Sequence, residues 1–387
     1  MATTTGDVVP GSWVVFLKPH LSADGKAAHL ESIQAMTRDP DKSFSCEAHY
    51  EFDLDEFRGY SGKFDLRTKE DIEKMDGVLS IEPVRYFRHC QLVSQPNTPW
   101  GLERISQPRK VQQNAPYHYR YRDDAAGQNT IAYIIDTGIN ASHVEFEGRA
   151  SPGPKFVTST PPASDGDVWG HGTHVAGIVG SRAYGVAKKV QIISIKVFSD
   201  ITSGARTDDI IKALEWIVSD ARARGKKAAV NMSLGGLISP ALNAAVAATV
   251  RSGIVVCVAA GNDMASYISP GLAEAKSPAS EPLAVTVAAM DKTDEISDFS
   301  NYGRLVDVFG PGTDITSTWI GSNSSTRTIS GTSMATPHVT GLACCLLSDG
   351  RLAEKTPYGV ASQITIKADK NKLLGLDRIT SNSILQV

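Results

Sequence analysis

Long apolar runs and an excess of one charge are both missing from this 387-residue sequence. A membrane-spanning helix needs about 18 or more consecutive apolar residues, and residues 254–260 form one of the longest apolar runs present. The 39 Lys and Arg residues nearly balance the 42 Asp and Glu residues, for a net charge of −3. Because a balanced charge offers no electrostatic basis for binding nucleic acid or an anionic membrane, we expect neither partner.

Cysteine is scarce, and a signal peptide is not evident at Met1. The start of the chain, MATTTGD, has neither the basic residues nor the apolar core of a secretory signal. Of the cysteines, Cys257 lies in an apolar strand pattern. Cys344 and Cys345 are neighbours in a predicted helix, where adjacent side chains project to different sides. We expect no disulfide after residue 92, which removes one argument for secretion. The five cysteines are Cys46, Cys90, Cys257, Cys344 and Cys345.

Three short motifs supply a carboxylate, an imidazole and a hydroxyl in one order along the chain. A serine hydroxyl is a poor nucleophile near neutral pH, so it needs a neighbouring base, and the base needs a carboxylate to fix its tautomer. Asp136, His171 and Ser333 are the candidates for these three roles. The motifs are IIDTG at 134–138, GHGTH at 170–174 and GTSMATP at 331–337.

The predicted local structure suits these roles. Asp136 follows the apolar run 131–135, which is typical of a buried parallel strand. Ligands and catalytic groups of α/β sheets gather at the carboxyl ends of such strands. His171 and Ser333 each precede a segment with a helical pattern, at 175–179 and 337–343.

Each motif alone has another interpretation. Asp-Thr-Gly also occurs in aspartic proteases, which need two such loops, and no second one is present. His171 and His174 could bind zinc, but no Glu or Cys stands at a familiar ligand spacing, so His174 is predicted to be structural. Ser333 could simply cap a helix. The joint occurrence of all three motifs in order favours the triad.

These motifs resemble those of the subtilisin-like serine proteases (peptidase S8), and in particular the proteinase K-like type of fungi. The chain order Asp, His, Ser is that of subtilisin, and the resemblance extends from about residue 98 to residue 347, with further matches at 231–236, 259–262, 299–303 and 309–312. It implies a serine endopeptidase that works through an acyl-enzyme. It also implies that Asn262 and the backbone N–H of Ser333 form an oxyanion hole; otherwise Asn262 would serve only a turn after Gly261.

The same resemblance points to the substrate-binding residues Trp169, Arg206, Ser233, Leu234, Gly235, Ala260 and Gly261. Segments 233–235 and 259–261 match strands that pair with an extended peptide and line the pocket before the scissile bond. These walls carry no charge, which predicts a preference for apolar or aromatic side chains. Trp169 should overhang the next subsite and Arg206 a more distal one, giving a narrower cleft that tolerates acidic or polar residues distally, unless both are merely exposed side chains.

The first 92 residues carry none of the triad. Their pattern predicts the order β-α-β-β-α-β of a small α+β ferredoxin-like domain, with a capping box at residues 68–71. This domain resembles an inhibitor I9-type propeptide, which chaperones folding and occupies the cleft of its protease through its own tail; an independent binding domain is the alternative. The resemblance places self-cleavage near Leu92 and Val93, to within several residues. The predicted elements span 13–18, 22–36, 44–51, 60–65, 68–75 and 78–86.

Residues 93–387 are predicted to form the catalytic domain, of the α/β class. Strands alternate with helices, among them a helix at 207–223 that has one apolar face and ends at Gly225. A second helix begins at Ser239 and Pro240. We therefore expect a subtilisin-like parallel sheet covered by helices on both faces. The predicted strands include 131–135, 228–232, 254–259, 283–288 and 305–309.

No cofactor is expected for the chemistry, but the resemblance implies a structural calcium ion held by the carbonyls of Pro282 and Ala284 and by Asp307. A solvated acid is the alternative for Asp307. The partners implied are protein or peptide substrates and the chain's own propeptide, on a monomeric enzyme. The family is usually secreted or vacuolar, and the start of the chain leaves the compartment open. General degradation, maturation of one peptide in a dedicated pathway, and peptide binding by a silent pseudoprotease remain as functions.

Overall fold

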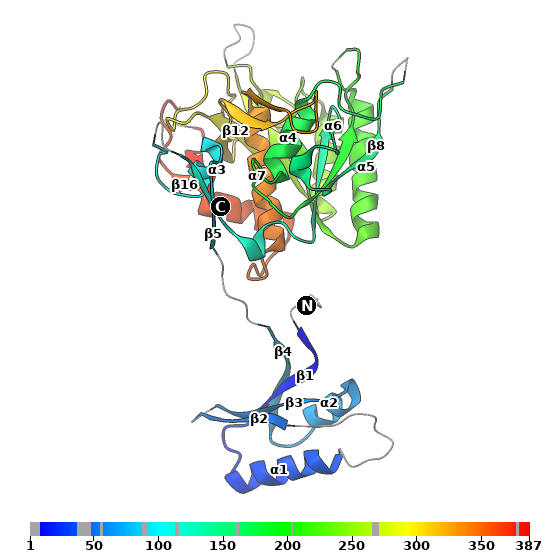
Figure 1. Cartoon of the computed structure of the whole chain (residues 1–387), viewed down its shortest axis with the longest axis vertical. Coiled ribbons are helices and arrows are strands. Elements are labelled where there is room, and N and C mark those ends of the chain that lie inside the picture. The colour runs from blue at the N-terminus through cyan, green and yellow to red at the C-terminus, as the bar shows by residue number, and fades with distance from the viewer. Residues whose placement is uncertain are drawn as a thin grey trace. The chain divides into compact units, whose positions relative to one another are not determined.

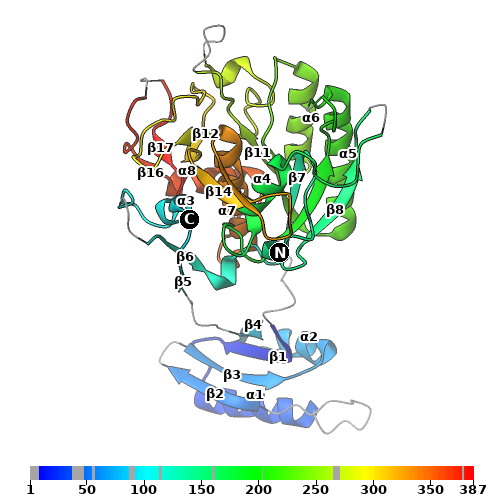
Figure 2. The ribbon, with the colours of Figure 1, turned by 45° about the horizontal axis from the view of Figure 1, so that its top comes forward.

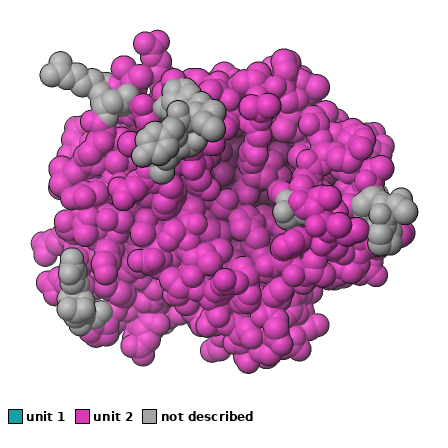
Figure 3. All heavy atoms as spheres, turned by 90° about the horizontal axis from the view of Figure 1, so that it is seen from above, with its two compact units in different colours: residues 1–89 teal, residues 90–387 magenta. Residues whose placement is uncertain are grey.

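The chain folds into two compact units, Met1–His89 and Cys90–Val387, coloured along the sequence in Figure 1. Figure 3 shows one face of the larger unit. The computed structural model describes residues 8–36, 48–54, 57–86, 92–112, 116–158, 162–202, 204–264, 271–376 and 379–387. Cys46 and Cys90 lie outside these ranges, whereas Cys257, Cys344 and Cys345 are free thiols. No helix in the described ranges combines the length and apolar character that a membrane crossing requires.

The smaller unit has the predicted β-α-β-β-α-β order. Its sheet is antiparallel with strand order β2-β3-β1-β4, and a core of residues such as Val15, Tyr60 and Phe64 joins the sheet to Ile33 and Ile72 on the helices. The elements are β1 (Val8–Leu17), α1 (Ala23–Met36), β2 (Ala48–Leu54), β3 (Phe57–Lys63), α2 (Leu66–Glu73) and β4 (Val78–Arg85).

The predicted capping box at residues 68–71 is wrong. Helix α2 begins earlier, at Leu66, because Asp65 is its N-cap and its carboxylate accepts the backbone N–H of Thr68 at 2.7 Å. A capping oxygen three residues before its donor is the usual geometry of a helix start. The pattern therefore identified the helix, but assigned its cap to the wrong residue.

The larger unit is built on a nine-stranded sheet with strand order β16-β17-β13-β12-β11-β10-β7-β9-β8. The seven strands from β13 to β8 pair in parallel, and β16 pairs antiparallel with β17 at one edge. The strands are β7 (Thr130–Asp136), β8 (Ala150–Lys155), β9 (Gln191–Lys196), β10 (Lys227–Met232), β11 (Val255–Ala259), β12 (Val285–Met290), β13 (Val308–Pro311), β16 (Asp369–Lys370) and β17 (Ser383–Ile384).

Helices cover both faces of this sheet, as predicted (Figure 2). Successive side chains of a strand point to opposite faces, and β7 shows the result: Ala132 and Ile134 join the core beneath α4 and α7, while Tyr133 and Ile135 join the core beneath α5 and α6. The helices are α3 (Trp100–Ile105), α4 (His171–Gly180), α5 (Thr207–Arg224), α6 (Pro240–Arg251), α7 (Thr332–Ser348) and α8 (Pro357–Lys367).

Two small antiparallel sheets complete the larger unit. In one, β14 (Ile315–Thr318) pairs with β15 (Thr326–Ile329). In the other, β5 (Leu92–Pro96) pairs with β6 (His118–Arg122), with Val93 opposite Tyr121. The expected cut between Leu92 and Val93 therefore falls at the first peptide bond of a strand that belongs to the larger unit; the cut itself stays a prediction.

Candidate active site

The first part of the site joins the end of β7 to the start of α4. Asp136 is fully buried at the carboxyl end of the strand, and its Oδ1 lies 2.7 Å from Nδ1 of His171, the first residue of α4. Glycine is needed where these segments meet, because a Cβ on Gly172 would stand 2.1 Å from the carbonyl oxygen of Gly138. The carboxylate and imidazole predicted from the sequence are therefore in direct contact.

The environment of His171 favours its charged form. Burial lowers the pKa of this imidazole, but the negative charge and hydrogen bond of Asp136, together with the charge of Asp167, outweigh burial and raise the pKa above the ordinary 6.5. A base that gains a proton beside a fixed carboxylate is what a serine nucleophile requires. The short contact with Asp136 and the raised pKa both suit His171 to act as a general base.

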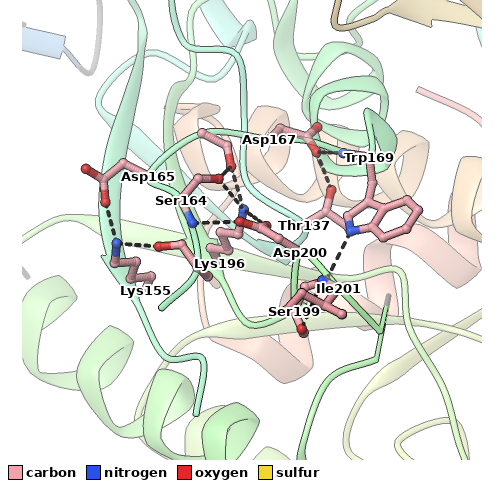
Figure 4. A network of polar contacts seen from close by, with 12 residues as sticks. Thr137, Lys155, Ser164, Asp165, Asp167, Trp169, Lys196, Ser199, Asp200 and Ile201 are labelled. Atoms are coloured by element: carbon pink, nitrogen blue, oxygen red, sulfur yellow. Dashed lines mark hydrogen bonds and ion pairs between the residues drawn. The ribbon is translucent and has the colours of Figure 1, made fainter. Parts of the chain in front are cut away.

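Asp167 organises the turn that carries His171, a role that the sequence motifs did not predict. Its carboxylate accepts the hydroxyl of Thr137 at 2.8 Å (Figure 4). It also accepts the backbone N–H groups of Gly170 and Thr173, at 2.8 and 2.9 Å. These bonds satisfy donors at the start of α4, whose N-cap residue, Gly170, has no side chain. An aspartate just before a helix start is a capping signal that could have revealed it.

Ser333 lies in the first turn of α7, whose start is held against the end of β10. Its hydroxyl donates to the carbonyl of Ser233 at 3.2 Å, and the hydroxyl of Ser233 donates back to the carbonyl of Ser333 at 2.8 Å. In this structure the nucleophile candidate therefore bonds to the pocket wall and not to His171. Catalytic hydrogen bonds are often formed only with substrate bound, and rotation about one side-chain bond would redirect this hydroxyl.

Asn262 is oriented by Thr332, the residue before Ser333. Its carbonyl oxygen, Oδ1, accepts the backbone N–H of Thr332 at 2.8 Å and the Thr332 hydroxyl at 2.9 Å. Because the oxygen is held in this way, the NH2 group is turned the other way, and it makes no hydrogen bond within the described residues. An unused amide donor beside a serine suits a site where negative charge develops.

A cavity of about 180 Å³ adjoins Ser333 and Asn262. The predicted wall residues Leu234, Gly235 and Gly261 line it, but so do Asp263 and Lys276. The expectation of uncharged walls is therefore wrong for the cavity as a whole: the sequence windows 233–235 and 259–261 omit a lysine that the fold brings in from residue 276. The two charges are paired, with Lys276 Nζ 3.0 Å from Asp263 Oδ1.

Trp169 joins the turn before His171 to the loop after β9. Its indole Nε1 donates to the carbonyl of Ser199 at 3.0 Å, and its backbone N–H donates to Asp167 at 3.0 Å (Figure 4). The two loops are also tied through buried Lys196, which pairs with Asp200 at 2.6 Å and donates to the carbonyl of Gly166 at 2.5 Å. The indole is thus a fixed part of the loop arrangement.

Arg206 lies at the start of α5 and already has an acidic partner. Its guanidinium forms two hydrogen bonds to Asp208, at 3.0 and 2.6 Å, and these raise its pKa. The predicted attraction of this residue for an acidic substrate side chain must therefore compete with Asp208, which weakens that expectation.

His174 is buried away from the triad, in keeping with a structural role. Its Nε2 donates to the carbonyls of Ile315 and Arg327, both at 3.0 Å, and burial lowers its pKa to about 4. The described ranges contain no group of three or more His, Cys, Asp or Glu side chains that could hold a metal ion.

The three residues expected to hold calcium lie around the start of β12 and of β13. Asp307 accepts the backbone N–H of Thr286 at 2.7 Å, and burial raises its pKa to about 6. No lysine or arginine in the described ranges forms an ion pair with it. A desolvated carboxylate that lacks a cationic partner fits a hard cation, so Asp307 is compatible with the predicted ion.

The chain was compared with known proteins. The model of the subtilase family (peptidase S8) matches residues 127–382, and that of peptidase inhibitor I9 matches residues 12–87. Alkaline protease 1 of Aspergillus clavatus is 38% identical, over 95% of this chain and 92% of that protein. Proteinase R of Parengyodontium album is 45% identical, over 82% of this chain and 77% of that protein. The crystal structure of a cold adapted subtilisin-like serine proteinase superposes with a TM-score of 0.65 at 39% identity, covering 75% of this chain and 98% of the other.

Proposed function

Because this chain belongs to the subtilase family of serine proteases and carries an I9-type propeptide domain, we propose that Asp136, His171 and Ser333 are the catalytic triad of an endopeptidase. The observation that carries the assignment is the 2.7 Å contact between Asp136 and His171. It joins two motifs whose residues are 35 positions apart in the sequence, and Ser333, in the first turn of α7, lines a cavity together with Asn262.

In the proposed mechanism, His171 takes the proton of the Ser333 hydroxyl as that oxygen attacks the carbonyl carbon of the scissile bond. Asp136 holds the imidazole in the required tautomer and stabilises its charged form. His171 then gives the proton to the leaving amine, which leaves an acyl-enzyme on Ser333. Water, deprotonated by His171, attacks the acyl carbonyl, and His171 returns this proton to the Ser333 oxygen as the carboxylic acid leaves.

Asn262 supplies the proposed oxyanion hole together with the backbone N–H of Ser333. Its NH2 group is directed by the two hydrogen bonds that Thr332 makes to its oxygen. Donors fixed before the reaction need no reorganisation when charge develops on the substrate oxygen, and this is usually the largest electrostatic contribution to the rate.

The N-terminal unit is proposed to be a propeptide that the enzyme removes from itself near Leu92–Val93 and that inhibits the cleft until it is degraded. Protein and peptide substrates are then the enzyme's partners. The pairing of β5 with β6 supports a mature chain whose first residues remain bound after the cut, since Val93 lies opposite Tyr121 in that sheet.

Calcium is proposed as a structural ion bound by the carbonyls of Pro282 and Ala284 and the carboxylate of Asp307. When bound, the ion would supply charge neutralisation for a buried carboxylate and stiffen a loop near the substrate cavity. It takes no part in the bond-breaking steps.

The test is fluorophosphonate labelling of the full-length protein, followed over time by intact mass, beside the Ser333→Ala variant. We expect labelling at Ser333 and loss of a fragment that ends near Leu92, with neither event in the variant. No labelling and no cleavage, even after limited trypsin treatment removes the N-terminal unit, would refute an active endopeptidase and favour a silent peptide binder.

A further inference from the structure

The cavity beside Ser333 is lined by a charge pair that lies outside the wall motifs. Lys276 and Asp263 line the same cavity as Ser333 and Asn262, and their side chains are only 17% and 30% exposed. Taking a lysine and an aspartate out of water is unfavourable unless both are well bonded. A charge pair in this cavity is therefore not what we expect of a pocket that selects only apolar side chains.

Asp263 is held in place on its far side by Asn301. The fully buried amide of Asn301 donates to Asp263 Oδ2 at 3.1 Å and accepts the backbone N–H of Asp263 at 2.8 Å. The other carboxylate oxygen, Oδ1, accepts from Lys276 at 3.0 Å. Each oxygen of Asp263 thus accepts a hydrogen bond, and these bonds fix the orientation of the carboxylate beside Lys276.

Lys276 has hydrogen-bond donors that no described residue accepts. An ammonium group has three N–H donors, and within the described residues Lys276 Nζ makes one hydrogen bond, to Asp263. The remaining donors belong to a group that lines the cavity next to the nucleophile. Since Asp263 balances the charge of Lys276, the unused donors favour a neutral acceptor over a second carboxylate, which would also meet Asp263.

We propose that Lys276 determines specificity at the primary pocket, by favouring an uncharged side chain that ends in a hydrogen-bond acceptor, such as Tyr or Gln, immediately before the scissile bond. The proposal rests on the triad proposed above, because it places this pocket beside Ser333. It refines the apolar preference expected from the wall segments: the walls pack against the stem of the side chain, and Lys276 bonds its tip.

The experiment uses the self-processed enzyme and peptide p-nitroanilides that differ only in the residue before the scissile bond. Tyr is compared with Phe, and Gln with Leu, so that each pair contrasts a side chain that has an acceptor with one that lacks it. A hydrogen bond to a charged donor changes kcat/KM by roughly tenfold, so we expect Tyr over Phe, and Gln over Leu, by about this factor.

Variants identify the residue responsible. Lys276→Met should bring both ratios close to one, whereas Lys276→Arg, which keeps charged donors, should preserve the preference. Lys276→Met leaves Asp263 without its cationic partner. Lys276→Met combined with Asp263→Asn therefore provides a second test in which this part of the cavity is uncharged, and Asn at position 263 can still form a hydrogen bond with Asn301. Each variant is first checked by fluorophosphonate labelling at Ser333.

The outcomes separate the two proposals. Hydrolysis and labelling by the unmodified enzyme with no preference within either pair would overturn the role of Lys276 and leave the protease assignment intact. A preference that survives in both Met-containing variants would overturn it as well. Failure of the unmodified enzyme to label and to cleave any peptide would overturn the protease assignment and this inference together.

Discussion

The orientation of Asn262 predicts how Thr332, a residue with no part in the proposed bond-breaking steps, should affect the rate. Thr332 donates two hydrogen bonds to the Asn262 oxygen, one from its backbone and one from its hydroxyl, at 2.8 and 2.9 Å. Thr332→Val keeps the shape and the backbone donor but removes the hydroxyl. The substitution removes the bond to Asn262, which is worth about 1 kcal/mol, and lets the amide turn away from its productive position. It also removes the longer bond, 3.3 Å, that the hydroxyl accepts from the backbone N–H of Gly261.

The expected effect follows from that magnitude. A loss of about 1 kcal/mol in transition-state stabilisation lowers kcat about fivefold, with little change in KM, because the oxyanion exists only in the transition state. By contrast, Asn262→Ala removes the donor itself and should lower kcat by roughly 100- to 1000-fold, which is the range for removing the corresponding side-chain donor of subtilisin.

A double-mutant cycle makes the prediction strict. If Thr332 acts only by holding Asn262, Thr332→Val should have almost no further effect in the Asn262→Ala background, since coupled residues are not additive. The assay is steady-state hydrolysis of one peptide p-nitroanilide by all four proteins. A full fivefold loss that persists without Asn262 would refute the reasoning and assign Thr332 to a role in the packing of α7.

Further predictions concern charge and shape. The pKa of His171 is raised above 6.5, and catalysis needs the neutral imidazole, so the acid limb of kcat/KM against pH should have an apparent pKa above 6.5. NMR titration of His171 in the Ser333→Ala protein should give the same pKa, and Asp136→Asn should lower the pKa of His171 below 6.5. Burial lowers the pKa of His29 from 6.5, so the unfolded N-terminal unit binds a proton more readily than the folded unit does. The stability of this unit should be full above pH 6.5 and decline below it. Hydrogen exchange of the full-length Ser333→Ala protein measures this stability, and His29→Phe should make it less dependent on pH. Trp169→Asn should widen the cleft and improve kcat/KM for substrates with a large residue two positions before the scissile bond, whereas Trp169→Phe, which keeps a ring but loses the bond to Ser199, should improve it less; equal profiles for all three proteins would exclude a substrate contact. Chelation of calcium should lower the melting temperature of the mature enzyme, and Asp307→Asn should abolish that sensitivity; an unchanged melting temperature would argue against the ion.

The family and the layered fold could be predicted because both depend on short-range patterns. The apolar run before Asp136 indicated a strand buried on both faces, and the structure divides its side chains between two cores. The subtilase and I9 matches confirm the resemblance drawn from the motifs. The boundaries were predicted less well: α7 begins at Thr332, before the predicted helical pattern at 337, because Pro337, a residue type that usually marks the start of a helix, lies inside this one.

Asp167 could not be assigned from the motifs because its role depends on several segments at once. Its partners Thr137 and Thr173 belong to β7's following turn and to α4. A hydrogen-bond hub of this kind has no spacing of its own in the sequence, since each bond is fixed by how the end of a strand meets the start of a helix. Only the capping relation to Gly170, three residues away, was local enough to be predicted.

The charges at the substrate cleft show why a count of residues in a motif does not establish the electrostatics of a site. Arg206 was predicted to let a distal subsite tolerate acidic or polar side chains, and the structure pairs it with Asp208, two residues along the chain. The primary pocket was interpreted as neutral because its wall motifs hold no charge, and the structure adds Lys276 and Asp263 from outside those motifs. In both cases the net charge changes little, but the number of free donors changes. Asp208 occupies two of the five N–H donors of Arg206, whereas Asp263 occupies one of the three donors of Lys276. Specificity in this enzyme should therefore follow unused donors and not net charge, and the comparison of Tyr with Phe at the primary pocket tests that distinction directly.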